Sequence, residues 1–330
     1  MKFNDAVGGK TRATIGRRSE SYMFDLVRYK AMHFAAFLLA SVLFVFAGSS
    51  EYAQEQAFVH AADKPNDHAL FDRVVENQKK SDAAMDVYER LERVEMHKVT
   101  GESQSTEVKV SRVVPAGTGA AHLPVGTDGK VSDQNAYRAE LEKLEKSLIW
   151  AAETGRTQRD AYEKIAKKRK EREELIGAAR AAFLFTLIGS EQRDGHVLLK
   201  YRMDPNPSFR PTSRATAIYP RVRGTVWIDE ASGELARIEG EVTDDISLGL
   251  FLAKVYKGSR FMQERYEMVP GLWLPSFSQY DFDGRKFLSS FSLHERMFYS
   301  NYRRVGTPKE ALELVRAELK EMKPGGVSSR

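Results

Sequence analysis

The chain has 330 residues and contains no cysteine. This absence excludes disulfide bonds, a thiol nucleophile, thiolate ligands for a metal and a lipid anchor on an acylated cysteine. Stability must therefore come from an apolar core. A hydrophobic content of 42% is enough to build one large domain or two small ones.

Motifs that carry catalysis or bind metals are missing as well. The seven histidines show no His-x-x-x-His spacing, which a helical zinc site needs, and no Gly-x-Ser-x-Gly elbow is present. The adjacent acids Asp244 and Asp245 would point apart in a strand. The sequence therefore predicts a protein that is not an enzyme and that has no cofactor or metal.

Two short segments imitate binding loops. The segment "DFDG" (Asp281–Gly284) begins like a calcium loop but lacks the later ligands, so it indicates a hairpin turn at Asp283-Gly284. The Gly/Pro-rich segment Pro115–Lys130 matches neither the dinucleotide-binding nor the P-loop spacing, so it indicates a surface loop.

The excess of basic residues is concentrated at the amino terminus. Of the 51 Lys and Arg residues and the 46 Asp and Glu residues, seven and three lie within residues 1–49. The rest of the chain is nearly neutral, so its net charge is poor evidence for nucleic-acid binding. We expect no nucleic-acid partner.

The amino terminus has the pattern of an export signal. A basic segment precedes the apolar run Ala31–Gly48, and the small residues Ala47 and Ser49 fit cleavage after Ser49. Translation from Met23 rather than Met1 would give a signal of ordinary length. The alternative is an uncleaved membrane anchor, because a run of about 18 residues is at the lower limit for spanning a bilayer. We expect residues 1–49 to be cleaved and the protein to be periplasmic; an uncleaved signal would leave it anchored to the membrane.

Composition divides the rest of the chain into five segments. We expect a disordered linker over 50–66, an amino-terminal helix and first β-hairpin over 67–132, a charged helical insertion over 133–183, an antiparallel sheet over 184–305, and a carboxy-terminal helix and tail over 306–330. The charged run Lys167–Glu174 indicates a solvated helix face, with a contact to acidic lipid as the alternative.

From Phe183 onward the chain alternates apolar runs with short turns, which predicts an antiparallel meander. Dipeptides typical of turns separate these runs: Asp194-Gly195, Ser232-Gly233 and Pro270-Gly271. In the strand before Ser232, Val226 and Ile228 lie on one face and Trp227 lies on the other.

Bulky apolar residues occur at both parities of these strands. Leaving a Phe exposed would forgo about 1.5–3 kcal/mol of burial, so both faces of the sheet need a covering. Helices can cover one face, but their apolar stripe at Leu141, Leu144, Leu148 and Ile149 is one narrow seam. The second covering would be a ligand, a partner or further protein. We expect a concave apolar cavity with a lining drawn from Trp227, Leu250, Phe251, Phe261, Trp273, Phe277 and Phe291.

Three stretches carry a resemblance to a known family: "GTVWIDEASGELARIEGEV", "FLAKVYKGSRFMQERYEMVPGLWLPSFSQYDF" and "FYSNYRRV". In this order they resemble exported, outer-membrane lipoprotein-sorting-like proteins, and they are also similar to the half-barrel carriers LolA and LolB and the regulator RseB. The resemblance covers about residues 185–305.

The resemblance implies an α+β fold in which an antiparallel β-sheet curls as a half-barrel over helices, with a concavity that can hold acyl chains. The charged helices over 133–182 depart from it, because a minimal carrier lacks them. No residue diagnostic of the carriers can be placed at a position of this chain.

The function that the resemblance implies is a non-catalytic carrier or binder of lipid or lipoprotein acyl chains in the cell envelope. The partners would be lipid or an acylated lipoprotein, together with an envelope protein. The alternative is an envelope sensor or scaffold without ligand transport. A continuous apolar cavity would favour the carrier, and a filled core with an exposed apolar patch would favour the scaffold.

Overall fold

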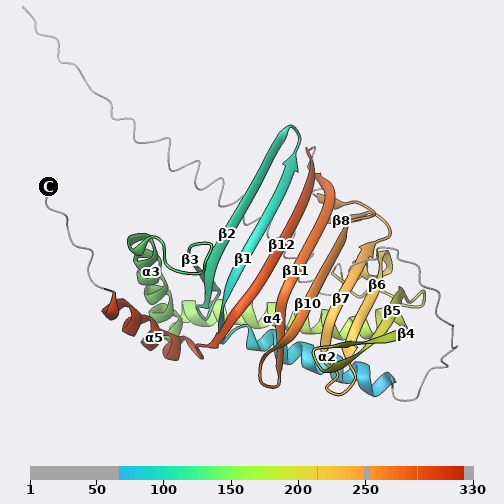
Figure 1. Ribbon diagram of the computed structural model, residues 1–330, viewed down its shortest axis with the longest axis horizontal. Helices are drawn as coiled ribbons and strands as arrows, with labels where there is room; N and C mark the ends of the chain where they lie inside the picture. Colours follow the sequence, from blue (N-terminus) through green and yellow to red (C-terminus); the bar gives the residue numbers. More distant parts are fainter. Residues whose placement is uncertain (1–66, 214, 249–252, 288, 323–330) are drawn as a thin grey trace, which may run out of the picture. The chain divides into compact units, whose positions relative to one another are not determined.

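The computed structural model describes residues 67–213, 215–248, 253–287 and 289–322 (Figure 1). The predicted signal peptide and linker lie outside these ranges, as do Leu250 and Phe251 of the expected cavity. Within the described ranges, no helix has both the length and the hydropathy that crossing a membrane requires.

A twelve-stranded antiparallel sheet forms the framework of the described structure. Its strands are β1 (Tyr88–Thr100), β2 (Ser103–Pro115), β3 (Ala120–Pro124), β4 (Phe183–Arg193), β5 (His196–Pro205), β6 (Val222–Asp229), β7 (Leu235–Val242), β8 (Ile246–Leu248), β9 (Ala253–Val255), β10 (Arg260–Val269), β11 (Leu272–Lys286) and β12 (Ser289–Arg304). Ten strands follow one another in the order β3-β2-β1-β12-β11-β10-β7-β6-β5-β4, and the short strands β8 and β9 join at β11.

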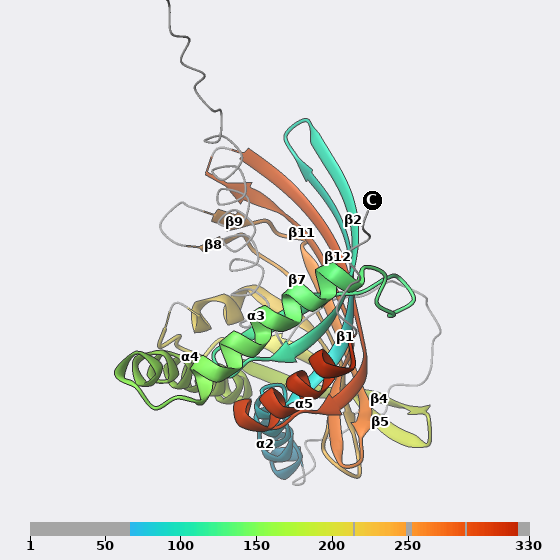
Figure 2. The same cartoon turned by 90° about the vertical axis from the view of Figure 1, so that its left-hand side faces the viewer.

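The sheet is curled but not closed, because β3 and β4 at the two ends of this order do not pair with each other. The helices are α2 (Asp67–Ala84), α3 (Gln134–Ala152), α4 (Arg156–Ala182) and α5 (Pro308–Glu321), with a short 3-10 helix η1 (Thr216–Arg221). Figure 2 shows α2 and α4 on the concave side of the sheet. The α+β half-barrel that the sequence predicts is therefore confirmed.

Local sequence explains where two of the helices begin. Helix α3 starts after Asp133, whose side chain accepts hydrogen bonds from the backbone N–H groups of Asn135 and Ala136 at 3.0 and 2.9 Å. Helix α5 starts with a reciprocal capping box between Thr307 and Glu310. In both cases a side chain satisfies backbone donors that the first helical turn leaves unpaired.

Three predicted turns are confirmed by glycines in the left-handed region. The φ angles are +85° at Gly195, +71° at Gly233 and +70° at Gly271, values that side chains with a Cβ rarely adopt. These glycines connect β4 to β5, β6 to β7 and β10 to β11.

The turn predicted at Asp283-Gly284 is wrong. Both residues lie inside β11 and pair with β12, and Gly284 also pairs with β9. A Cβ at Gly284 would lie 2.3 Å from the carbonyl oxygen of Lys254 and 2.8 Å from the ring of Phe291. This glycine is therefore required by the close approach of neighbouring strands and not by a turn.

The end of the sheet formed by β2 and β3 has a core of its own, which α3 and α5 cover. Leu141, Leu144 and Leu148 of α3 are fully buried there, together with residues of β2, β3 and α5. At the edge of this core, Arg112 of β2 contacts Glu89 at 2.7 Å and Glu318 of α5 at 2.7 Å. The first of the expected charged helices, α3, therefore buries an apolar seam against the carboxy-terminal helix.

Candidate functional site

A small apolar cavity lies between the sheet and the two helices on its concave side. Its volume is about 70 Å³, and its wall is almost entirely apolar. The residues that line it are Phe71, Val74, Val75 and Gln78 of α2, Ile176, Ala179 and Arg180 of α4, Phe185 of β4, Met203 of β5, Val226 and Ile228 of β6, and Leu235 and Ile238 of β7.

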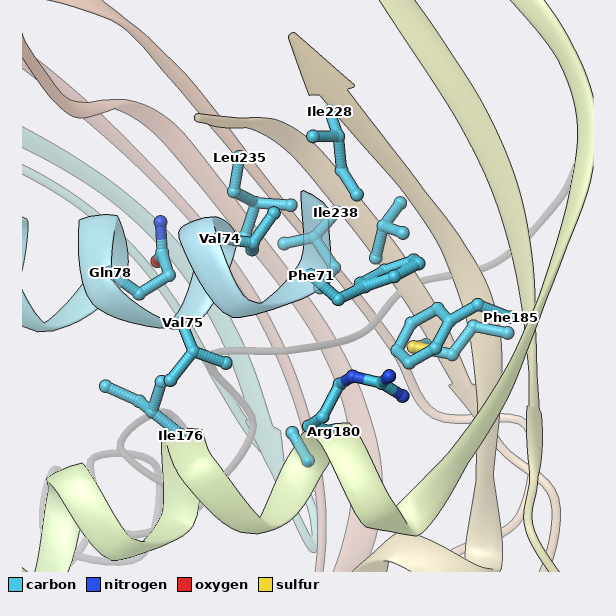
Figure 3. Close-up of a pocket in the computed structure, with 13 residues that line it drawn as sticks. Phe71, Val74, Val75, Gln78, Ile176, Arg180, Phe185, Ile228, Leu235 and Ile238 are labelled. Carbon is cyan, nitrogen blue, oxygen red and sulfur yellow. The ribbon is translucent and has the colours of Figure 1, made fainter. Parts of the chain in front are cut away.

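Helical and strand periodicity explain this lining. Phe71, Val74, Val75 and Gln78 recur at the spacing that places side chains on one side of a helix. Residues of β6 alternate between faces, so only those with the parity of Val226 point towards α2 and α4. Figure 3 shows side chains of α2, α4 and the strands converging on one space. We call this side of the sheet the inner face.

Aromatic contacts close the β4 end of the cavity. The ring of Phe71 lies 4.2 Å from the ring of Phe185 and 5.1 Å from that of Tyr201, measured between centroids. The guanidinium of Arg180 lies over the Phe71 ring at 5.6 Å, in the arrangement of a cation–π contact. The rim therefore carries a positive charge next to an apolar interior.

Helix α2 is held to the tips of two hairpins by its polar side chains. Asn77 donates to the carbonyl oxygens of Ser232 and Gly233 at 3.1 Å, at the tip of the β6–β7 hairpin. Lys80 donates to the carbonyl of Gly271 at 3.0 Å, at the tip of the β10–β11 hairpin. The contact between the helices, by contrast, is an ion pair: Asp82 of α2 lies 2.6 Å from Arg172 of α4. A second ion pair joins Asp86, just after α2, to Arg169 of α4.

Near α2, the inner face of β10 and β11 carries polar side chains. Arg265, which is 3% exposed, donates through Nε to Oε1 of Gln263 at 3.0 Å, and Gln263 in turn donates to Ser278 at 3.2 Å. Burial lowers the pKa of Arg265 to about 10 and raises that of Glu234 above its usual value. Near α2, the inner face thus passes from apolar at β4–β7 to polar around Gln263, Arg265 and Ser278 of β10 and β11.

A buried acid marks the inner face of β12. Glu295 is paired across the sheet with Tyr280 of β11 and Met96 of β1. Burial, and then repulsion from the Glu92 carboxylate, raises the pKa of Glu295 to about 7. Both protonation states of this carboxyl are therefore present near neutral pH.

The structure divides the predicted cavity residues between the two faces of the sheet. Phe261 and Phe291 lie on the inner face, as the strand register shows. Trp227, Trp273 and Phe277 lie on the opposite, outer face, and Trp227 and Trp273 are in one buried cluster there. None of these five described residues lines the cavity of Figure 3. A ligand contact at any of them stays a prediction.

The covering of Trp227 on the outer face consists of charged side chains. Lys200 and Arg237 lie over its ring at 5.0 and 4.9 Å, and its indole N–H donates to Glu191 at 3.1 Å. Long basic side chains can cover apolar surface with their aliphatic parts while their charges reach water. A bulky residue on this face therefore needs neither a ligand nor a helix to be buried.

The sequence contained a usable signal for the true lining. Leu70, Val74 and Val75 show helical spacing, and two of them, Val74 and Val75, line the cavity. In β6, Val226 and Ile228 share a parity opposite to Trp227. Had the face of β6 that carries its aliphatic residues been chosen as the ligand side, instead of the face that carries Trp227, the prediction would have named β6 residues that line the cavity. The contribution of α4 carries no comparable signal, because most of that helix is charged.

The polar grouping that most resembles a catalytic arrangement serves a turn. Asp229 accepts hydrogen bonds from Oγ of Ser232 at 2.6 Å and from His196 at 3.1 Å. Burial raises the pKa of Asp229, but these hydrogen bonds outweigh it and leave the pKa below its usual value. Because the acid lies between the serine and the histidine, the histidine cannot activate the serine.

Comparison with known proteins gives distant structural similarities. No protein-family model matches the sequence, and no curated protein is significantly similar to it. A LolA superfamily protein from Nitrosomonas europaea is 8% identical, with a TM-score of 0.28, over 74% of this chain and 96% of its own.

Two further solved structures match over similar lengths. A DUF1329 family protein from Desulfovibrio piger is 11% identical, with a TM-score of 0.25, over 72% of this chain and 92% of its own. A domain named for outer membrane lipoprotein sorting, from Vibrio parahaemolyticus, is 12% identical, with a TM-score of 0.28, over 76% of this chain and 100% of its own. Two of the three names belong to the groups that the sequence motifs resemble. At such low identities and TM-scores they assign no ligand or activity to this chain.

Proposed function

We propose that this protein is a non-catalytic binder of acyl chains in the cell envelope, with lipid or an acylated lipoprotein as its partner. The observation that carries the proposal is the apolar cavity between α2, α4 and β4–β7. Ligand sites are typically concave and mostly apolar, with few polar groups. The proposal includes export to the periplasm through the amino-terminal signal.

The cavity is too small for a whole acyl chain, so binding requires movement of a helix. A volume of about 70 Å³ holds only a few methylene groups. Helix α2 is hydrogen-bonded to two hairpin tips, whereas α4 is joined to it through side-chain ion pairs. We therefore propose that the acyl chain enters where α2 and α4 separate, with Val75 and Ile176 on the two sides of the opening.

The small volume also favours a second candidate, an envelope scaffold or sensor whose core is simply packed. The two functions differ in one measurable respect. A carrier binds an acyl chain saturably and with defined stoichiometry, whereas a packed scaffold does not.

The test is titration of the delipidated protein with a fluorescent fatty acid. Ala179→Phe places a large ring in the cavity and should weaken binding at least tenfold, a loss of about 1.4 kcal/mol. Ala166→Phe adds the same ring on an exposed position of the same helix and should leave binding unchanged.

A second variant tests the proposal even if Ala179→Phe does not fold. Ile228→Ala enlarges the cavity and should increase affinity for the fatty acid, even though the protein loses stability. Absence of saturable binding to the unmodified protein would favour the scaffold. Equal binding by Ala179→Phe and Ala166→Phe would place the ligand elsewhere.

A further inference from the structure

The wall of the cavity contains a buried amide that is not hydrogen-bonded. Gln78 is 8% exposed, and its Nε2 is buried without a hydrogen-bond partner in the described structure. Such groups are rare in folded proteins, because an unsatisfied buried donor costs about 1–3 kcal/mol. Figure 3 shows the amide nitrogen on the side of α2 where Val74 and Leu235 lie.

Gln78 also lies where the residues on the inner side of α2 change from apolar to polar. The preceding turns present Phe71, Val74 and Val75 to the cavity, whereas the following turn presents Ser81 and Asp82. Ser81 donates to the carbonyl oxygen of Trp273 at 2.9 Å, and Asp82 contacts Arg172 at 2.6 Å. These two side chains are therefore satisfied within the protein.

We propose that the ligand carries a carbonyl group at the end of its acyl chain and that Gln78 Nε2 donates a hydrogen bond to that carbonyl oxygen. This inference rests on the proposed function and narrows its substrate class to esters or amides of fatty acids. The chain would lie among the apolar residues towards β4, with its polar end directed towards β10 and β11.

An uncharged carbonyl suits this position better than a free carboxylate. Asp82 follows Gln78 by one helical turn, and Glu234 directly precedes Leu235 of the cavity wall. Glu234 is itself buried, and its Oε2 has no hydrogen-bond partner in the described structure. Arg172 and Arg265 offset these acids in part, so a free fatty acid can still bind. Its carboxylate would nevertheless add a further buried charge, which costs more in a low-dielectric interior than an uncharged carbonyl does.

The experiment compares two uncharged ligands of equal chain length, dodecane and methyl decanoate, as competitors of the bound fluorescent fatty acid. The unmodified protein should prefer the ester. Gln78→Met keeps the length of the side chain but removes the donor, and should reduce that preference about tenfold. Gln192→Met, at an exposed position of β4, is the control and should keep the preference.

The outcomes distinguish a failure of the role proposed for Gln78 from a failure of acyl-chain binding itself. If both ligands compete but the unmodified protein shows no preference, or Gln78→Met keeps it, the role of Gln78 is wrong and acyl binding stands. If neither ligand competes and the fatty acid does not bind, the proposed function itself fails. Thermal unfolding of Gln78→Met shows whether the variant is folded, and its binding of dodecane supplies the internal reference.

Discussion

A single glycine sets the geometry of the hairpin tip on which α2 rests. Gly233 has a φ of +71°, and a Cβ there would lie 3.0 Å from the Cβ of Arg73 on α2. Both the backbone and the neighbouring helix therefore exclude a larger residue. The same tip supplies carbonyl oxygens to Asn77, so distortion of the turn is transmitted to the helix.

We expect Gly233→Val to lower the free energy of unfolding by about 1 kcal/mol or more, because a β-branched residue resists positive φ. Chemical denaturation measures the change. Gly177→Ala is the matched control: this residue lies within α4 with nothing near its added Cβ, so the substitution should stabilise by up to about 1 kcal/mol. An unchanged midpoint for Gly233→Val would contradict the turn geometry.

Glu295 makes stability depend on pH in a defined direction. Burial, with repulsion from Glu92, raises its pKa in the folded state to about 7, against 4.5 for an unperturbed carboxyl. As the pH rises above 4.5, the unfolded chain releases this proton first. The folded state then binds more protons than the unfolded state, so the contribution of this group to stability falls.

We expect Glu295→Gln to stabilise the protein more at about pH 8 than at about pH 5, with a difference of about 2–3 kcal/mol. Urea unfolding of both proteins at the two pH values measures it. A stability difference that is equal at both values would show that Glu295 ionises normally in the folded protein.

At the scale of elements, the sequence predicts most helices and turns because their signals are local. Asp133 caps α3 through its own side chain, and Gly195 and Gly233 form turns through their own backbone conformation. Gly284 follows an aspartate in the same way, yet it is needed for contact between β11, β9 and β12. A dipeptide cannot reveal a requirement that arises from strands distant in sequence.

The candidate site was harder to predict than the elements that form it. Trp227 and Phe277 are the bulkier residues, but the strand register places them on the outer face, where Lys200 and Arg237 cover the tryptophan. Residue size gives no information about which face of a strand meets the helices. That choice depends on the position of α2, which is determined by tertiary contacts.

The seam between α3 and α5 shows how charged helices contribute to the core. Leu144 is fully buried in it, whereas Ile149, which shares the apolar stripe in the sequence, is 38% exposed. We expect Leu144→Ala to cost about 2–5 kcal/mol of unfolding free energy and Ile149→Ala less than about 1 kcal/mol. Thermal unfolding of the two variants measures the contrast, and equal losses would mean that the seam is not formed as described.

At the scale of the whole described sheet, curling without closure leaves two edges, and these edges differ in composition. The unpaired part of β2 is polar and carries the ion pair Lys109–Glu107 at 2.7 Å. Strand β4, by contrast, has no charged residue between Phe183 and Ser190 and exposes Leu184 and Ile188 by 52% and 46%. Charged side chains at an edge oppose pairing with other chains, and apolar ones favour it.

We therefore expect aggregation on heating to begin at β4. Ile188→Lys places a charge on this edge at a position that is already exposed, so it should slow aggregation several-fold while changing the unfolding free energy by less than about 0.5 kcal/mol. Light scattering during a temperature ramp measures the rate. Val108→Lys provides the control, since Val108 is 48% exposed on the opposite, polar edge and the same charge should have little effect there. Equal protection by both substitutions would mean that net charge, rather than the β4 edge, limits aggregation.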